Sequence, residues 1–163
     1  MEDFIASLMG AWSQQAGHLG SIALKIGIII ILTTILGCER ARNRHAAGLR
    51  TFMVVGLAST SVAIADLYLI QQLGVSFPFL SAATLIGIAV IGANTILFSS
   101  KNQLKGLTTA VGLWMTAIIG VVLGLGLYTV TLIGYVVLML CLTVFTRLET
   151  FNKRSSNHFE VHL

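Results

Sequence analysis

The sequence predicts an all-α integral membrane protein with five transmembrane helices, preceded by a short amphipathic helix at the membrane interface. Hydrophobic residues make up 56% of the 163-residue chain, and charged residues make up only 10%. A soluble domain usually has about a quarter of its residues charged, so this chain has too little polar surface to cover a water-soluble globule. Several apolar runs also approach the ~20 residues that a helix needs to cross a bilayer.

The elements follow in order from these apolar runs and the polar segments between them. In residues 2–16, Phe4, Leu8 and Trp12 share one helical side, which favours an amphipathic helix lying on the membrane. The five spans are expected at about residues 22–36, 49–69, 79–98, 107–122 and 127–145. We therefore expect an interfacial segment at 1–20, a membrane domain at 21–146 and a mobile, cytoplasmic polar tail at 147–163.

The basic residues predict the orientation of the bundle. With five spans, one face of the membrane receives nearly all of them: Arg40, Arg42, Arg44, Arg50, Lys101, Lys105, Arg147, Lys153 and Arg154. Basic loops remain in the cytoplasm, so this face is expected to be cytoplasmic, with the N-terminus outside and the C-terminus inside. Arg40 and Arg50 flank the turn between the first two spans with Glu39, and the remaining arginines with Lys101 and Lys105 form a basic patch that is expected to contact anionic lipids. The functional alternative is a docking face for an acidic partner or an anionic solute.

Asp66 is the one carboxylate clearly inside a predicted span, where an ionised side chain usually has a partner or a task. It lies sixteen residues beyond Arg50, about 24 Å along a helix, and therefore in the outer half of the membrane. Glu39 lies at the opposite end, so the two carboxylates do not form a built-in Mg²⁺ cage, and no metal ligand can be named. Asp66 either pairs with Lys25 or serves transport or sensing, and Glu39 is expected to bond Arg50.

Small residues recur through the third and fourth spans. In the fourth span Thr108, Gly112, Thr116, Gly120 and Gly124 are each four residues apart, so they line one helix face and permit close approach of another helix. In the third span Gly87 and Gly92 are expected to pack in the same way, and Asn94 is expected to bond a neighbouring helix. Packing within one protomer, a homo-oligomer contact and a path for a small solute all remain open.

The chain contains none of the common catalytic signatures, so we expect no enzymatic activity and no cofactor. Cys38 and Cys141 are far apart and lack metal-ligand spacing. Nucleic-acid binding is not expected either, because no aromatic residues are interleaved with the basic patch.

Four ordered blocks resemble the MgtC/SapB family of bacterial inner-membrane proteins. Residues 37–40 and 47–51 match the family's G-x-E-R and A-G-L-R-T, and Asp66 falls where the family has an aspartate. Residues 106–114 and 124–128 are close to its G-L-T-T-A-A-x-x-W and G-x-G-x-Y. Residues 87–94 resemble its G-I-G-F-L-G-A-G, but Ala89, Val90 and Asn94 depart from that pattern and make the third span bulkier and more polar.

The resemblance implies five transmembrane helices in the bacterial inner membrane and a link to Mg²⁺ limitation, acid stress or survival inside host cells. Such proteins are more often regarded as regulators of other membrane machinery, such as the F-type ATP synthase, than as Mg²⁺ carriers. We expect the chain to be nearer the short SapB/YhiD-like members, because it ends soon after the last predicted span.

We therefore expect a non-enzymatic, oligomeric inner-membrane protein that acts on ion homeostasis through contacts with other membrane proteins or lipids. The alternative is a small transporter for Mg²⁺, another cation or a small solute. The residues expected to carry the function are Glu39, Arg40, Arg50, Thr51, Asp66, Asn94, Thr108, Thr109 and Trp114.

Overall fold

The computed structural model describes residue 5 and residues 19–42, 47–74, 76–98 and 104–156. Five helices lie in these ranges: α2 (Leu19–Arg42), α3 (Leu49–Leu73), α4 (Phe79–Ala93), α5 (Leu107–Gly124) and α6 (Tyr128–Ser156). Two short strands, β1 (Leu97–Phe98) and β2 (Leu104–Lys105), pair antiparallel between α4 and α5, with Leu97 opposite Lys105. The five predicted helices are thus confirmed, while the expected interfacial helix at 2–16 lies outside the described residues apart from Ile5.

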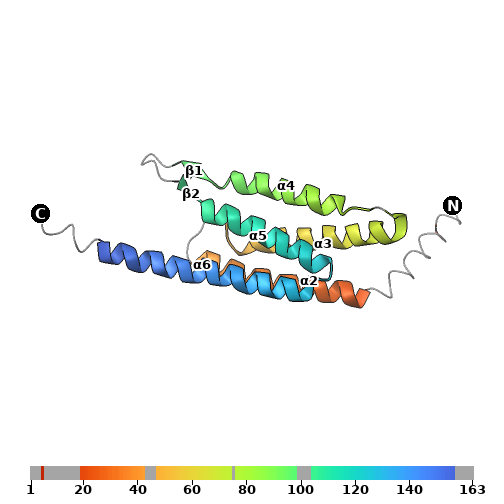
Figure 1. Cartoon of the computed structure of the whole chain (residues 1–163), viewed down its shortest axis with the longest axis horizontal. Helices are drawn as coiled ribbons and strands as arrows, with labels where there is room; N and C mark the ends of the chain where they lie inside the picture. Colours follow the sequence, from red (N-terminus) through yellow and green to blue (C-terminus); the bar gives the residue numbers. More distant parts are fainter. Residues whose placement is uncertain (1–4, 6–18, 43–46, 75, 99–103, 157–163) are drawn as a thin grey trace, which may run out of the picture.

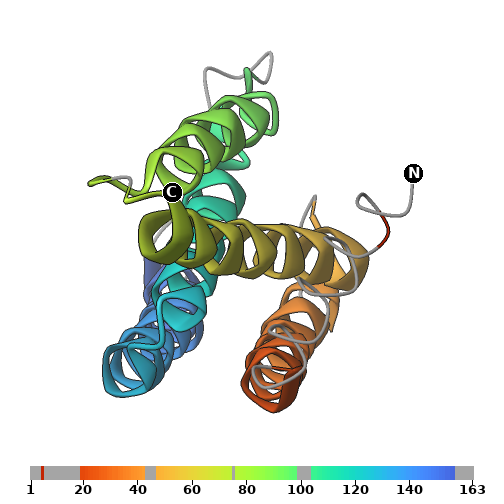
Figure 2. The same cartoon turned by 90° about the vertical axis from the view of Figure 1, so that its right-hand side faces the viewer.

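The helices lie roughly along one common axis, and α5 occupies the middle of the bundle (Figure 1). It packs against α3, α4, α6 and, more lightly, α2. Seen along the axis, α4 lies at one edge of the bundle, whereas α2 and α6 form two separate legs on the other side of α3 (Figure 2). A helix in such a central place must approach several neighbours closely, which explains why α5 carries so many small residues.

The helix bounds differ from the sequence prediction at three places. Helix α2 continues to Arg42, so Glu39 and Arg40 lie in its last turns rather than in a connecting turn. Helix α4 stops at Ala93 and gives way to the β1–β2 pair, so Asn94 is a C-cap residue and not part of a span to residue 98. Helix α6 runs on to Ser156, so residues 147–156 continue the last helix beyond the expected end of the fifth span.

The outward surface of the bundle is strongly apolar. Ile31, Val54, Ile86 and Ile133 are each between 60% and 68% exposed. Within the part of the chain that the structure describes, three helices are long and apolar enough to cross a membrane, namely α2, α3 as far as Gln71, and α5; residues Phe79–Ala93 and Tyr128–Thr143 form shorter apolar helices. Apolar surface on this scale marks a contact with lipid or protein rather than with water.

The small residues of α5 lie against α3 at backbone distance. A Cβ atom added at Gly120 would lie 2.8 Å from the Gly56 carbonyl oxygen, and one at Gly124 would lie 2.5 Å from the Ala63 Cβ. Gly112 faces the ring of Phe52, and Thr116 is buried on the same side. The stripe therefore serves packing within one protomer from Gly112 to Gly124, although Thr108 at its start is exposed.

The small residues of α4 behave differently from those of α5. Gly92 is buried against Ala110, whose carbonyl oxygen would lie 3.3 Å from an added Cβ. Gly87 is exposed, and an added Cβ there would meet nothing within 4 Å. The packing role expected for Gly87 is therefore not seen within this chain, because its face of α4 points away from α3 and α5.

Candidate functional site

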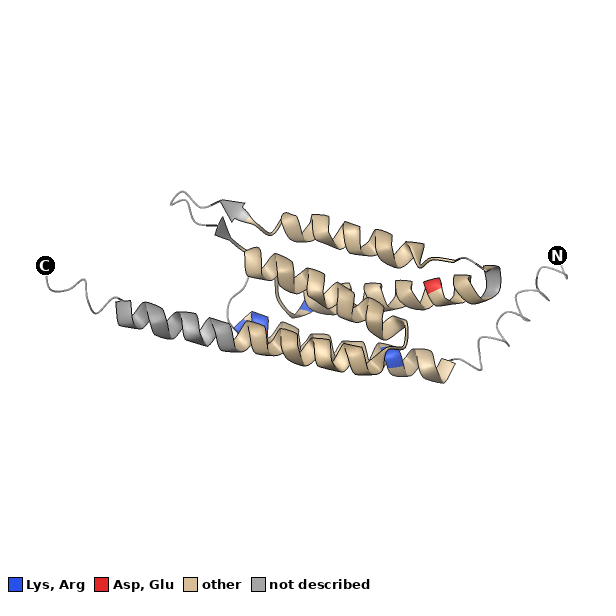
Figure 3. Ribbon diagram, viewed as in Figure 1, with Lys and Arg blue, Asp and Glu red and all other residues tan. Residues whose placement is uncertain are grey.

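The charged residues that are coloured in Figure 3 lie near the two ends of the bundle. We call the end where α2 finishes and α3 begins the arginine end, because it holds Arg40, Arg42 and Arg50. We call the opposite end, which holds Lys25 and Asp66, the far end.

Asp66 caps a neighbouring helix at the far end. Its Oδ1 accepts a hydrogen bond from the Leu80 N–H at 3.1 Å, and its Oδ2 accepts one from the Ser81 N–H at 2.6 Å. These donors lie in the first turn of α4, whose own N-cap residue, Pro78, supplies no side-chain cap. The carboxylate is only 2% exposed. Its negative charge is stabilised there by the otherwise unpaired N–H groups and the positive end of the α4 dipole.

Lys25 has the complementary position at the same end. Its Nζ donates a hydrogen bond to the Gly124 carbonyl oxygen at 2.7 Å, at the C-terminus of α5. A cation at a helix C-terminus is favoured by the dipole, as an anion is at an N-terminus. The pair suggested between Asp66 and Lys25 is therefore not formed, because each side chain binds the helix end of opposite partial charge.

Replacing Asp66 with alanine should loosen the first turn of α4. We expect faster hydrogen exchange at the Leu80 and Ser81 amides and a loss of about 1–2 kcal/mol in stability, because the two N–H groups lose their acceptor in an apolar setting. Ser61→Ala is the matched control on α3, since Ser61 is exposed and bonds only its own helix, at the Leu57 carbonyl oxygen. Equal exchange in the two variants would contradict the capping role.

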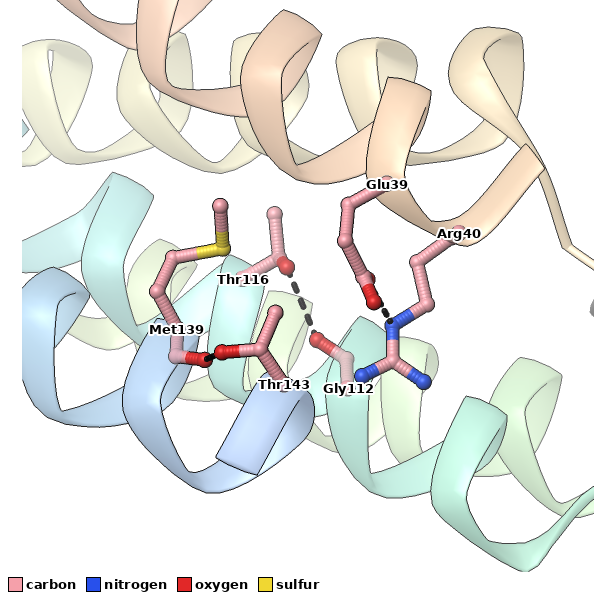
Figure 4. Close-up of polar contacts among 6 residues, drawn as sticks. All are labelled: Glu39, Arg40, Gly112, Thr116, Met139 and Thr143. Atoms are coloured by element: carbon pink, nitrogen blue, oxygen red, sulfur yellow. Dashed lines mark hydrogen bonds and ion pairs between the residues drawn. The ribbon is translucent and has the colours of Figure 1, made fainter. Parts of the chain in front are cut away.

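Glu39 and Arg40 form an ion pair at the arginine end. The Arg40 Nε and the Glu39 Oε2 are 3.1 Å apart, and the two side chains are 0% and 15% exposed, respectively. Figure 4 shows both side chains reaching from α2 toward α5 and α6. The expected Glu39–Arg50 bond is thus replaced by a pair between adjacent residues, and Arg50 is exposed at the start of α3.

Hydroxyl groups around this pair are bound to backbone carbonyl groups. Thr116 donates to the Gly112 carbonyl oxygen at 2.8 Å, and Thr143 donates to that of Met139 (Figure 4). Thr33 likewise donates to the Ile29 carbonyl oxygen at 2.6 Å. In a helix surrounded by apolar groups, this back-bonding removes the cost of burying a hydroxyl donor.

The other predicted site residues do not gather around Glu39 and Arg40. Thr109 is buried on α5, whereas Thr51, Thr108 and Asn94 are exposed, and Trp114 is 41% exposed on the outward side of α5. Asn94 makes its capping contacts through its backbone N–H, to the carbonyl oxygens of Val90 and Gly92. The predicted polar set is therefore divided between the bundle interior and its surface, and only Glu39 and Arg40 form a pair.

Two further helix-to-helix hydrogen bonds are made by residues that the sequence analysis did not single out. Thr60 is fully buried on α3 and donates to the Gly120 carbonyl oxygen at 3.1 Å. Tyr135 on α6 donates to the Leu32 carbonyl oxygen on α2 at 2.9 Å. Thr60 could have been found from the sequence by its spacing, because it lies four residues after Gly56. That spacing places both residues on the face of α3 that meets Gly120.

Among the described residues, no three His, Cys, Asp or Glu side chains come together in a group that could hold a metal ion. Cys38 and Cys141 are exposed free thiols on α2 and α6.

Most of this chain matches a known protein family. The MgtC family model matches residues 26–151. The chain belongs to the MgtC family. This membership confirms the resemblance seen in the G-C-E-R and A-G-L-R-T segments, which lie at the arginine end of the structure.

Relatives of this MgtC family chain include proteins from several bacteria. It is 36% identical over 129 residues to the "Putative magnesium transporter YhiD" of Escherichia coli K12, covering 76% of this chain and 59% of that protein. It is 31% identical to "Protein SrpB" of Synechococcus elongatus, covering 83% and 80%, and 32% identical to "Protein MgtC" of Salmonella typhimurium LT2, covering 72% and 49%. The chain thus spans little more than half of the YhiD protein. No solved structure matches it.

Proposed function

We propose that this MgtC family chain is a five-span protein of the bacterial inner membrane that regulates ion homeostasis without enzymatic activity. It acts through contacts with other membrane proteins or lipids, with its arginine end in the cytoplasm. The observation that carries the proposal is the closure of the bundle interior: the glycines of α5 lie within backbone distance of α3. An interior packed this closely favours action through the outward surface rather than through a central path.

The engagement of the buried charges supports the same proposal. Asp66 is held by the N–H groups of α4, Lys25 by the α5 carboxyl end and Glu39 by Arg40. A cation carrier needs carboxylate or carbonyl oxygens that can turn toward the ion. Mg²⁺, for example, is bound by carboxylate oxygens and water. Here the Asp66 and Glu39 carboxylates are already bound to groups within the bundle.

The second candidate function is transport of Mg²⁺, another cation or a small solute. It is favoured by the name of the E. coli relative, which calls that protein a putative magnesium transporter. On this alternative, the solute passes along the contact between α4 and α5, and Asp66 leaves its capping position during each cycle.

A flux assay with purified protein in sealed liposomes, together with a co-purification experiment, separates the two candidates. If the protein is a regulator, we expect no Mg²⁺ or proton flux above that of empty liposomes. We also expect a membrane protein partner to co-purify with the wild type but not with Arg50→Ala. Arg50 is chosen because it is exposed and outside the packed interior. Flux that Asp66→Asn abolishes would instead establish the carrier and reject the regulator.

A further inference from the structure

The three arginines of the arginine end have two different environments. Arg40 is fully buried and paired with Glu39, so it belongs to the fold. Arg42 and Arg50 are both exposed. The sequence places all three on the same side of the membrane, but in the structure only Arg42 and Arg50 are at the surface.

Arg42 lies at the end of an outward stripe on α2. Going up the helix, Ile31 is 61% exposed, Ile35 is 49% exposed, and Cys38 is an exposed thiol. The spacings to Arg42 of four, three and four residues place all four side chains on one helix face. The opposite face holds the buried Thr33, Leu36 and Arg40. The stripe therefore points away from the core and ends in a cation.

Arg50 begins a stripe of the same design on α3. Val54 is 65% exposed and Leu57 is 37% exposed, and Ser61 continues the face with the same spacing. Phe52, Val55 and Ser59 are buried on the other side. The first turn of α3 contains no acidic residue that would neutralise Arg50.

Close packing brings the two arginine-bearing helix ends together. A Cβ atom added at Gly37 on α2 would lie 2.7 Å from the Leu49 Cα at the start of α3. Leu49 adjoins Arg50, and Gly37 lies a little over one turn before Arg42. Two exposed guanidinium groups thus end apolar stripes on two neighbouring helices, whereas Lys25 and Asp66 at the far end are bonded to helix termini.

We propose that Arg42 and Arg50 form a binding site for an anionic phospholipid, with the headgroup phosphate on the guanidinium groups and the acyl chains along the α2 and α3 stripes. This inference rests on the proposed placement of the bundle in a membrane, and it names one partner of that outward surface. Charge complementarity selects the occupant: guanidinium binds phosphate oxygens through two parallel N–H···O bonds, and the apolar stripes require a ligand with hydrocarbon chains. A zwitterionic lipid offers the same chains without the net negative charge.

The exposed thiol at Cys38 provides a local reporter of this site. A Cys141→Ser protein labelled at Cys38 with a small fluorophore is placed in phosphatidylcholine vesicles containing a minor fraction of brominated phosphatidylglycerol or, separately, brominated phosphatidylcholine. We expect the anionic lipid to be enriched at the label by roughly fivefold or more, since each basic side chain near the surface contributes about that factor. In the Arg42→Gln/Arg50→Gln variant, quenching by brominated phosphatidylglycerol should fall to the level seen with brominated phosphatidylcholine.

Two matched proteins control for general lipid contact and for charge alone. A Cys38→Ser protein labelled at Cys141 on α6 should be quenched equally by both lipids, because that exposed position lies on another helix. Arg42→Lys/Arg50→Lys should keep part of the preference, because lysine retains the charge but not the paired hydrogen bonds. Both exposed arginines lie outside the core, so circular dichroism should be unchanged in these variants.

Each remaining outcome is decisive. Equal quenching of wild type by the two lipids at Cys38 would overturn the anionic-lipid site while leaving the membrane placement intact. No quenching by either lipid would reject the lipid-facing stripe and the proposed membrane function with it. Loss of the preference on adding soluble glycerol phosphate would reassign the arginines to a free phosphate ester and overturn the lipid as occupant.

Discussion

Gly120→Ala should lower the free energy of unfolding by about 2 kcal/mol, because the added methyl group has no space between α5 and α3. Its Cβ would lie 2.8 Å from the Gly56 carbonyl oxygen, 2.9 Å from the Ser59 Cβ and 3.2 Å from the Thr60 Oγ1. The nearest of these atoms is backbone and cannot rotate away. The two helices must separate, which also lengthens the Thr60 hydrogen bond to Gly120.

Gly134→Ala is the matched control for this change. Gly134 lies within α6, and a Cβ atom there would meet nothing within 4 Å. Alanine is the better helix former, so this variant should be neutral or more stable by up to about 1 kcal/mol. Thermal unfolding of both variants in the same detergent measures the difference. If both changed stability in the same direction, the close α3–α5 contact would be contradicted.

Arg40→Met should be the most damaging change at the arginine end, with a loss of about 3 kcal/mol or more. Removing one member of a buried pair leaves the other charge without compensation, whereas replacing both by uncharged groups is often close to neutral. Glu39 is only 15% exposed, so its carboxylate has little access to water once the guanidinium is gone.

The double variant Glu39→Gln/Arg40→Met tests that explanation. It should recover most of the lost stability, because it removes the uncompensated charge and keeps side chains of similar size. Arg42→Met, two residues further along α2, is exposed and should change stability by no more than about 0.5 kcal/mol. A double variant no better than Arg40→Met alone would show that Arg40 stabilises the bundle chiefly by packing, not by its charge.

These two predictions concern contacts that join α5 to α3 and α2 to its neighbours. The α5 glycines position the helix in the middle of the bundle, and the Glu39–Arg40 pair lies where α2 faces α5 and α6. The proposed regulator presents its outward surface to partners, so the interior contacts matter by keeping that surface in one arrangement.

Much of the local structure could be predicted from the sequence. The apolar runs located α2 to α6, since a chain with so few charged residues must bury or shield its backbone in helices. The spacing of Gly112, Thr116, Gly120 and Gly124 identified a close-packing face before any neighbour was known. Gly126, with a φ of 88°, ends the link between α5 and α6 near the predicted break, because glycine adopts this conformation without a steric penalty.

The partners of the charged side chains could not be predicted in the same way. Asp66 and Lys25 were natural candidates for a pair because both lie in the same half of the bundle, yet each binds a helix terminus. Gly87 and Gly92 share a sequence context, but only Gly92 faces α5. Such outcomes depend on how each helix is rotated about its axis, and packing between helices sets that rotation.

The sequence by itself determined the helical class, the approximate place of each helix and the end of the bundle that carries the arginines, because hydropathy and charge act locally along the chain. Only the tertiary structure decided that Arg40 is buried while Arg42 and Arg50 are exposed, and that Asp66 holds α4. The physical reason is that two positions along a helix correspond to more than half a turn. Charged residues that are close in sequence, such as Arg40 and Arg42, therefore face opposite environments once the helices pack.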